Sequence, residues 1–333
     1  HNQDRKYIMH NGVSFDGPVL ERLLGITIPL ENIIDTLLIS QMINAHIDGG
    51  HSLKSWGKKL TRGGKLEFKD FEEYSEEMLK YCQQDVHVTR KLMAHLAPKI
   101  TRFSVESVRM EHRVRRIIDQ QEKNGFYLNV NKAHDLLEEL KTKSEDLKKD
   151  LKTIFPTIYT PRFHKTTGKP LKDHVDEFNP SSRKQVAERL QKKYNWLPSK
   201  TTPTGLPVID EKVLKELDYP EAKMIAEYLL YEKRVSQIQS WLKNVKGDNR
   251  VHGRVITLGC VTSRMSHYGP NMAQVPASYS PYGKECRSLW TIQDPNKYCL
   301  VGSDASGLEL RCFAHYLQNP KFTEQVVDGD IHT

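Results

Sequence analysis

The feature that most constrains the fold is a pair of long helical patterns in the middle of the chain, separated by a basic segment. Between residues 133 and 154, apolar side chains recur at three-, four- and seven-residue steps. This spacing predicts an amphipathic helix of about 20 residues or more that ends at Pro156. A second pattern opens at Pro220, a residue favoured in the first turn of a helix, and continues to Leu242. Residues 161–176 show no periodicity and predict a loop, so we expect an extended helical arm rather than a compact bundle.

The segments on either side of this arm have a different pattern of apolar residues. Residues 1–98 mix short apolar runs with helical patterns, including a helix over Glu73–Leu96 with a local break near Gln83. Val105–Asn124 predicts a helix that Gly125 ends. After residue 248 the pattern predicts strand over 251–261 and 298–303, and then a helix over 306–317. The chain is therefore expected to be an α/β multidomain protein with domains at 1–98, 99–248 and 249–333.

Charge and composition restrict the possible partners. Residues 101–200 sum to about +8 and residues 301–333 to about −3. A basic middle beside an acidic end suits a phosphate-backbone interface next to a metal site, although a solvated lysine-rich surface would look the same. No apolar run approaches the ~18 residues of a membrane span. Five scattered cysteines without a C-x-x-C pair indicate reduced thiols, so we expect a cytoplasmic protein without a zinc site.

The strongest chemical signal is the string S-D-A-S-G-L-E-L-R at Ser303–Arg311, where a predicted strand delivers Asp304 to the start of a helix. A carboxylate there can bind a hard divalent cation. The string resembles motif A of family A DNA polymerases, the bacterial DNA polymerase I type, in its short-tailed-phage subgroup. The resemblance implies that Asp304 is catalytic and binds two Mg²⁺ ions, with the carbonyl of Ala305 completing one metal shell. It also implies that Glu309 and Arg311 lie at the incoming deoxynucleoside triphosphate (dNTP).

Two neighbouring segments resemble the part of that family that grips primer–template DNA. Thr262–Pro276 is similar to the pattern T-G-R-x-[ST]-x-x-x-P-N-L-x-x-I-P, with Ser263 in place of the usual glycine, and Pro281–Arg287 continues the likeness. Arginine and glutamine can donate to the minor-groove acceptors that every base pair presents, which suits sequence-independent binding. The residues expected to contact DNA are Arg264, Asn271, Gln274 and Arg287.

The basic arm carries a further likeness. Phe178–Val186 resembles the thumb signature N-P-x-S-x-x-Q of the same family. Ser181 and Ser182 can cap the following helix and donate to a phosphate at its N-terminus, although capping alone would explain both serines. The resemblance implies DNA contacts for these serines and for Arg183 and Lys184.

The first hundred residues resemble an RNase H-like proofreading exonuclease of the DEDD type. His10–Asp16 is similar to its N-x-x-x-F-D motif, and Tyr81–Asp85 to its Y-x-x-x-D motif. Four-residue spacing places Tyr81 and Asp85 on one face of a helix. The resemblance implies that Asp16 and Asp85 bind a second pair of Mg²⁺ ions, that Tyr81 orients the attacking water, and that the ligand is a single-stranded DNA 3′ end.

The family pattern also defines what these residues lack. The D-x-E exonuclease motif, the polymerase fingers and the H-D-E segment are absent, so we expect a truncated fragment that is inactive alone, in which His332 would meet the incoming dNTP. The segment from Pro156 to Phe178, about 20 residues long, offers too little area to suggest a binding site for a thioredoxin-type processivity factor. The predicted function is template-directed DNA synthesis with 3′–5′ proofreading in DNA replication. A stand-alone 3′–5′ exonuclease and a non-catalytic DNA-binding part of a split polymerase remain alternatives.

Overall fold

The computed structural model of the protein describes residues 5–62, 64, 66–198, 200–203, 205 and 207–329. The chain divides into two compact units, His1–Trp290 and Thr291–Thr333, which are described separately. None of the helices in the described ranges combines the length and hydropathy that a bilayer crossing requires. The division at Trp290 lies inside the third expected domain, so the three domain boundaries stay a prediction.

The N-terminal part of the first unit is an α/β assembly around a two-stranded parallel sheet. Strand β1 (Tyr7–Met9) pairs with β2 (Ile33–Asp35), with Tyr7 opposite Ile33. The helices are α1 (Asp16–Leu24), α2 (Thr36–Ile43), α3 (Leu53–Leu60) and α4 (Glu76–Ile100), with a short 3₁₀ helix η1 (Leu30–Asn32). Two buried clusters fill it, formed by Val13, Ile33, Leu38, Ile39, Trp56, Leu92 and Leu96. Strand β1 leads directly into the 10–16 segment, and β2 leads directly into α2.

Helix α4 corrects one expectation, because it runs unbroken from Glu76 to Ile100. Ser75 caps it by accepting a hydrogen bond from the Met78 N–H at 3.1 Å. The polar residues near Gln83 suggested a break, but Gln83 is exposed. Helix α4 buries one face through Val88, Leu92 and Leu96, which are spaced four residues apart. The polar residues near Gln83 therefore belong to the opposite, solvent-facing side of a continuous helix.

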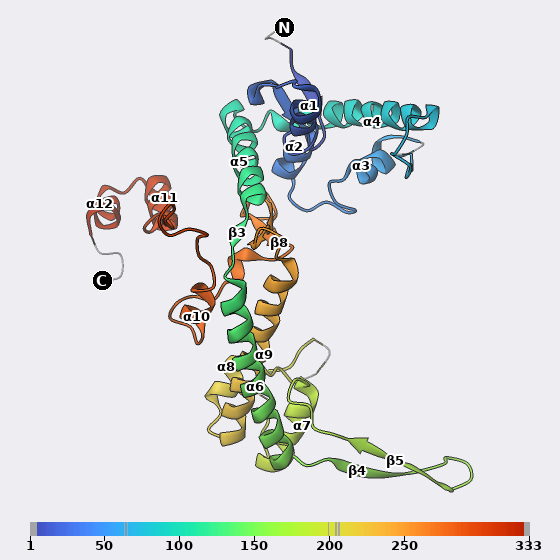
Figure 1. Ribbon diagram of the computed structural model, residues 1–333, viewed down its shortest axis with the longest axis vertical. Helices are drawn as coiled ribbons and strands as arrows, with labels where there is room; N and C mark the ends of the chain where they lie inside the picture. Colours follow the sequence, from blue (N-terminus) through green and yellow to red (C-terminus); the bar gives the residue numbers. More distant parts are fainter. Residues whose placement is uncertain are drawn as a thin grey trace. The chain divides into compact units, whose positions relative to one another are not determined.

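The helical part begins with α5 (Val105–Asn124), whose predicted bounds are confirmed. Gly125 ends it with a φ of 62°, a left-handed conformation that glycine adopts without strain. Strand β3 (Phe126–Tyr127) pairs antiparallel with β6 (Arg250–Val251). The two predicted long helices are present as α6 (Val130–Ile154) and α9 (Pro220–Asn244), which pack along each other in Figure 1. Pro220 stands in the first turn of α9, as predicted.

Two buried clusters line the contact between α6 and α9. One extends to α7 (Arg183–Tyr194) and α8 (Glu211–Glu216), and the other to α10 (Gly283–Arg287). Their most enclosed members include Leu140, Leu151, Leu190, Leu214, Ile225, Ile238, Val251 and Leu289. Burying apolar surface stabilises a fold by about 25 cal/mol per Å². The contact between α6 and α9 is therefore the main source of stability for the arm.

The segment between α6 and α7 was predicted to be a loop, and that prediction is wrong. It forms an antiparallel hairpin of β4 (Ile158–Phe163) and β5 (Pro170–Asp176), with Tyr159 opposite Val175 and a register shift between Thr160 and Arg162. Residues 159–175 are all exposed. An alternating pattern arises when one face of a strand is buried, so a ribbon exposed on both faces leaves none in the sequence.

Strands β7 (Arg254–Ile256) and β8 (Ser266–Tyr268) pair antiparallel, and the 3₁₀ helix η2 (Met272–Gln274) follows them. In the second unit, α11 (Leu308–Leu317) confirms the predicted helix and α12 (Pro320–Asp328) follows. The predicted strand over 298–303 does not form, because none of the described strands pairs with this segment. Leu300 and Val301 remain 70% and 88% exposed.

Candidate functional site

The motif that carries Asp304 lies in the second unit as a loop that leads into α11. Asp304 and Ala305 are exposed. Gly307 stands at the N-cap of α11 with a φ of 58°, and Glu309 lies in the first turn. The Arg311 Nε donates to the Ser306 carbonyl at 2.9 Å. This bond ties the side chain of Arg311 to the loop that carries Asp304, while His332 lies outside the described residues.

The exonuclease-like segment 10–16 is built around the carboxylate of Asp35, which has no exposed surface. Asp35 Oδ1 accepts the N–H groups of Asn11 and Leu37, both at 2.9 Å, and Oδ2 accepts the Val13 N–H at 3.1 Å. A buried carboxylate held by several backbone N–H groups is well satisfied. Asp35 therefore fixes the loop that ends at Asp16, the first residue of α1.

Asp16 is half-buried, and burial raises the pKa of its carboxyl above the ordinary value. A backbone hydrogen bond opposes this shift, and the nearby Asp35 charge adds to it. A bound cation would lower the cost of keeping such a carboxylate ionised.

Tyr81 and Asp85 lie on α4, four residues apart. The Tyr81 ring packs against Phe68 and Phe71, with centroids 5.9 and 5.7 Å away. Within the described ranges, no group of three or more His, Cys, Asp or Glu side chains is close enough to hold a metal ion. A metal site shared by the two carboxylates of Asp16 and Asp85 therefore stays a prediction.

A buried ion cluster on α5 was not anticipated from the sequence. The Arg115 guanidinium donates to Asp119 Oδ1 at 2.6 Å and to Glu122 Oε1 at 2.9 Å, and all three side chains are at most 16% exposed. Burial works against the charge of Arg115, but its hydrogen bonds to Glu122 and Asp119 outweigh burial and hold the pKa of Arg115 above its usual range. Spacings of four and seven residues on one helix face were the available signal.

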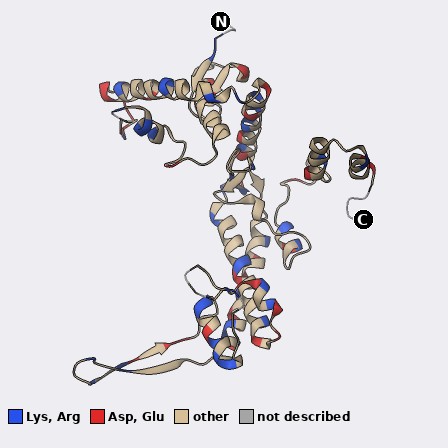
Figure 2. Ribbon diagram, turned by 180° about the vertical axis from the view of Figure 1, so that it is seen from behind, with Lys and Arg blue, Asp and Glu red and all other residues tan. Residues whose placement is uncertain are grey.

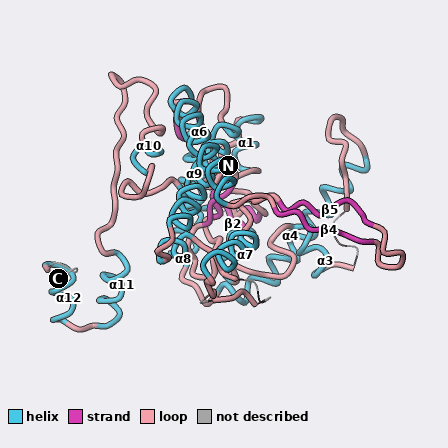
Figure 3. Tube along the Cα trace, turned by 90° about the horizontal axis from the view of Figure 1, so that it is seen from below, coloured by secondary structure: helices cyan, strands magenta, loops and turns pink. Residues whose placement is uncertain are grey.

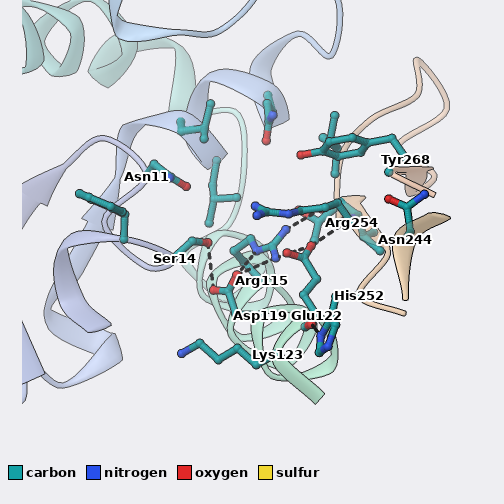
Figure 4. Close-up of a pocket in the computed structure, with 18 of the residues that line it drawn as sticks. Asn11, Ser14, Arg115, Asp119, Glu122, Lys123, Asn244, His252, Arg254 and Tyr268 are labelled. Atoms are coloured by element: carbon teal, nitrogen blue, oxygen red, sulfur yellow. Dashed lines mark hydrogen bonds and ion pairs between the residues drawn. The ribbon is translucent and has the colours of Figure 1, made fainter. Parts of the chain in front are cut away.

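This cluster holds elements from two parts of the chain, as Figure 4 shows. Arg115 Nη1 donates to the Val255 carbonyl at 2.6 Å, and Glu122 Oε1 accepts the Val255 N–H at 2.9 Å, so both residues clamp β7. On the other side, Ser14 Oγ donates to Asp119 Oδ2 at 2.9 Å. The loop before Asp16 and the strand before the 262–276 segment therefore rest on the same face of α5.

A cavity of about 650 Å³ opens above this cluster (Figure 4). Its lining joins the exonuclease-like segment to β7 and β8, through Asn11, Ser14, Lys123, His252, Arg254 and Tyr268. The cavity lining carries more cations than anions. This charge balance suits either an anionic nucleic-acid strand or solvent.

The segment expected to grip DNA keeps its turn despite the serine at position 263. Ser263 has a φ of 60°, where glycine is the favoured residue. The turn is closed by the Ser263 N–H donating to Cys260 O at 2.9 Å and the Cys260 N–H donating to Arg264 O at 3.1 Å. Arg264 follows this turn as an exposed side chain.

The other three residues of that group have structural partners. The Arg287 Nε donates to the Pro276 carbonyl at 2.8 Å, and the Asn271 side chain accepts the Ala273 N–H at 3.0 Å. Gln274 is exposed, and its carbonyl accepts from the Gln237 side chain at 3.0 Å. These bonds fix the backbone around residues 271–276, and DNA contact by the four residues stays a prediction.

At the start of α7, Ser182 caps the helix by accepting the Gln185 N–H at 3.4 Å, as expected. Ser181 is not a second cap, because its hydroxyl is 3.1 Å from the Tyr228 hydroxyl. Arg183 and Lys184 are exposed in the first turn. The helix N-terminus thus presents two cations to solvent, which is compatible with the predicted phosphate contact.

The chain matches two protein-family models and several known proteins. Residues 134–333 match the model described as DNA polymerase family A, and residues 1–101 match the model of a 3′-5′ exonuclease. The DNA-directed DNA polymerases of Escherichia phage T7 and Enterobacteria phage T3 are each 31% identical over 454 aligned residues, covering 98% of this chain and 64% of the relative. DNA polymerase I of Helicobacter pylori is 35% identical over 160 residues, 47% of this chain and 17% of that protein.

The fold was compared with solved structures as well. The POL domain of Pol1 from M. smegmatis, in complex with DNA primer-template and dNTP, superposes with a TM-score of 0.68 at 17% identity. The match covers 90% of this chain and 48% of that one, and it shows a shared fold. The chain spans 64% of the length of the phage relatives.

Proposed function

Because this chain belongs to DNA polymerase family A, we propose that its protein is a DNA-directed DNA polymerase with a 3′–5′ proofreading exonuclease that acts in DNA replication. The observation that carries the proposal is the order of the two matches, an exonuclease over residues 1–101 followed by a polymerase over 134–333. A stand-alone exonuclease would have no use for the second match. The proposed domains are an exonuclease at 1–98, a thumb at 99–248 and the start of a palm at 249–333.

The proposed ligands are primer–template DNA, dNTPs and a single-stranded DNA 3′ end. Arg264 and Arg287 would contact the duplex on one side, and Arg183 and Lys184 on the other. Support comes from the exposure of Arg264, and from the bond to Pro276 that orients the guanidinium of Arg287. Sequence-independent binding needs such contacts to phosphates and shared groove acceptors.

We propose divalent metal ions as cofactors, and Mg²⁺ because hard carboxylate and carbonyl oxygens are its preferred ligands. Asp304 and the Ala305 carbonyl would hold it at the polymerase site, and Asp16 and Asp85 at the exonuclease site. When bound, such ions stabilise the charge that develops on a transferring phosphoryl group. Glu309 and Arg311 would lie at the incoming dNTP, and Tyr81 beside the exonuclease ligands.

We infer that the protein works in the cytoplasm, that of the host cell if it is viral, where DNA and dNTPs meet. All five cysteines are free thiols, which agrees with a reducing compartment. We propose that it uses no thioredoxin-type processivity factor, because the segment between α6 and α7 offers only a short hairpin.

The first experiment measures duplex binding by this chain as a function of salt. We expect the affinity for primer–template DNA to fall steeply with salt, because neutralised phosphates release counterions. Arg264→Gln should weaken binding to all sequences equally and reduce the salt slope by about 1. Arg22→Gln, an equal charge change on exposed helix α1, is the matched control. Salt-independent binding, or none, would refute the proposal.

The second experiment uses the complete reading frame. Asp304→Ala should abolish primer extension and leave duplex affinity unchanged, because many weak contacts hold the DNA while Asp304 acts only through the metal. Near-normal turnover by that variant would remove Asp304 from the catalytic site. Robust primer extension by these 333 residues alone would refute the expectation that they are inactive without the H-D-E segment.

A further inference from the structure

The β4–β5 hairpin is rooted firmly in the arm. Asp176, the last residue of β5, accepts from the Gln185 side chain at 2.6 Å and from Arg189 Nη2 at 3.1 Å. Arg189 is only 7% exposed and the Asp176 side chain is 30% exposed, so this ion pair anchors the hairpin at the edge of the interior. Just beyond the root, the rings of Phe155 and Phe178 pack at 4.8 Å. The direction in which the hairpin leaves α6 and α7 is therefore fixed by buried contacts.

The rest of the hairpin extends away from those helices, as Figures 1 and 3 show. The stretch 161–172 carries four cations and no Asp or Glu (Figure 2). All of its residues are exposed. The cations are Arg162, Lys165, Lys169 and Lys172. Across the ranges that the structure describes, none of the four forms an ion pair. The tip thus concentrates positive charge that no side-chain ion pair among the described residues neutralises, with Asp173 next along β5.

The turn that presents these cations is ordered by its own hydrogen bonds. His164 Nδ1 accepts the N–H groups of Thr166 and Thr167 at 3.3 and 3.2 Å, and the His164 N–H donates to Lys169 O at 2.8 Å. Gly168 supplies the left-handed residue with a φ of 66°. An ordered turn on a fixed root loses little conformational entropy when it binds a ligand.

We propose that the β4–β5 hairpin is a separate contact for duplex DNA, in which its four cations bind backbone phosphates. The inference rests on the proposed function for the identity of the ligand and adds a surface outside the residues assigned above. Charge complementarity favours DNA over a protein partner, because an all-cationic tip matches the repeated phosphates of a duplex. The root also joins the hairpin to the first turn of α7, where Arg183 and Lys184 are exposed.

The experiment compares two fourfold variants of this chain in equilibrium binding to a primer–template duplex at several salt concentrations. The hairpin variant is R162Q/K165Q/K169Q/K172Q. In a plot of log Kd against the logarithm of the salt concentration, the slope for this variant should be smaller by about 0.9 for each lost phosphate contact, up to about 3.6. The control variant removes the same charge from lysines that the structure pairs with neighbouring carboxylates, K141Q/K149Q/K215Q/K223Q. The control should keep nearly the wild-type slope.

Three results would overturn the inference. If the hairpin variant binds duplex as tightly as the wild type while Arg264→Gln binds more weakly, the hairpin is not a DNA contact and the proposed function stands. If the hairpin variant loses affinity only for single-stranded DNA, the assigned ligand is wrong. If Tyr159→Ser/Phe163→Ser weakens duplex binding and the charge variant does not, the hairpin contacts DNA through its exposed apolar side chains and not through its cations. Circular dichroism should show both fourfold variants folded, because every substituted side chain is on the surface.

Discussion

The Ser14 hydroxyl and the Asp119 carboxylate form a 2.9 Å hydrogen bond although the two residues are 105 positions apart. Ser14 lies two residues before Asp16, in the loop whose Asn11 and Val13 N–H groups donate to the Asp35 carboxylate. Asp119 belongs to the cluster on α5 whose Arg115 and Glu122 clamp β7. The exonuclease-like loop and the strand that leads to the DNA-gripping segment are therefore positioned by one helix.

Removing the hydroxyl of Ser14 should loosen that loop. We expect Ser14→Ala to lower the free energy of unfolding by about 1.5 kcal/mol, the usual worth of a hydrogen bond to a charged group. Amide exchange at Val13 and Phe15 should rise in the variant. Ser236→Ala, at an exposed position of α9, is the control and should change stability by less than about 0.5 kcal/mol. Unchanged exchange at both amides would mean that Asp35 alone holds the loop.

Substitution of Arg115 should be far more damaging. Arg115→Met leaves Asp119 and Glu122 as buried charges without their partner, which costs about 3–5 kcal/mol. The triple variant R115M/D119N/E122Q removes the uncompensated charges and should recover part of the loss in urea denaturation. A single variant as stable as the wild type would show that solvent reaches the cluster.

Ser263 should be a position where stability can be gained. Its φ of 60° puts the backbone of Ser263 in the left-handed region. This conformation costs a residue with a Cβ about 1–2 kcal/mol. Ser263→Gly should therefore stabilise the protein by about 0.5–1 kcal/mol, after the larger entropy loss of glycine on folding. Ser263→Ala keeps the Cβ and should match the wild type in thermal unfolding. A destabilising effect of glycine would mean that the serine hydroxyl makes a needed contact.

Cys286 should be chemically silent in the folded protein. Burial raises the pKa of its thiol to about 11, because the thiolate would be desolvated. Cys82, Cys299 and Cys312 are exposed. Iodoacetamide at pH 8 should label these three quickly and Cys286 only after denaturation, as mass spectrometry of peptides can show. Labelling of Cys286 at the rate of Cys299 would contradict its place in the core.

The sequence was informative where one face of an element is buried. The limits of α5, α6 and α9 follow from apolar spacing and from Gly125, Pro156 and Pro220. It failed where that condition does not hold. The hairpin is exposed on both faces, and the apolar run at 298–303 finds no partner strand among the described residues.

The candidate site shows the same division. Local signatures such as the Ser182 cap could be predicted, since their partners lie within a few residues. The roles of Asp35 and Arg115 could not, because their partners are up to 140 positions away and are brought together only by folding. The closeness of Asp16 and Asp85 belongs to this second class and stays a prediction.

The fixed root of the hairpin also bears on how such a chain can change through evolution. The ion pair between Asp176 and the buried Arg189 fixes where the hairpin re-enters the arm, whatever precedes it in the chain. Each doubling of a flexible loop adds only about 0.6 kcal/mol of closure entropy. The turn at residues 164–169 is therefore a tolerant insertion point, where a whole extra domain could be accepted without repacking the helices beneath it.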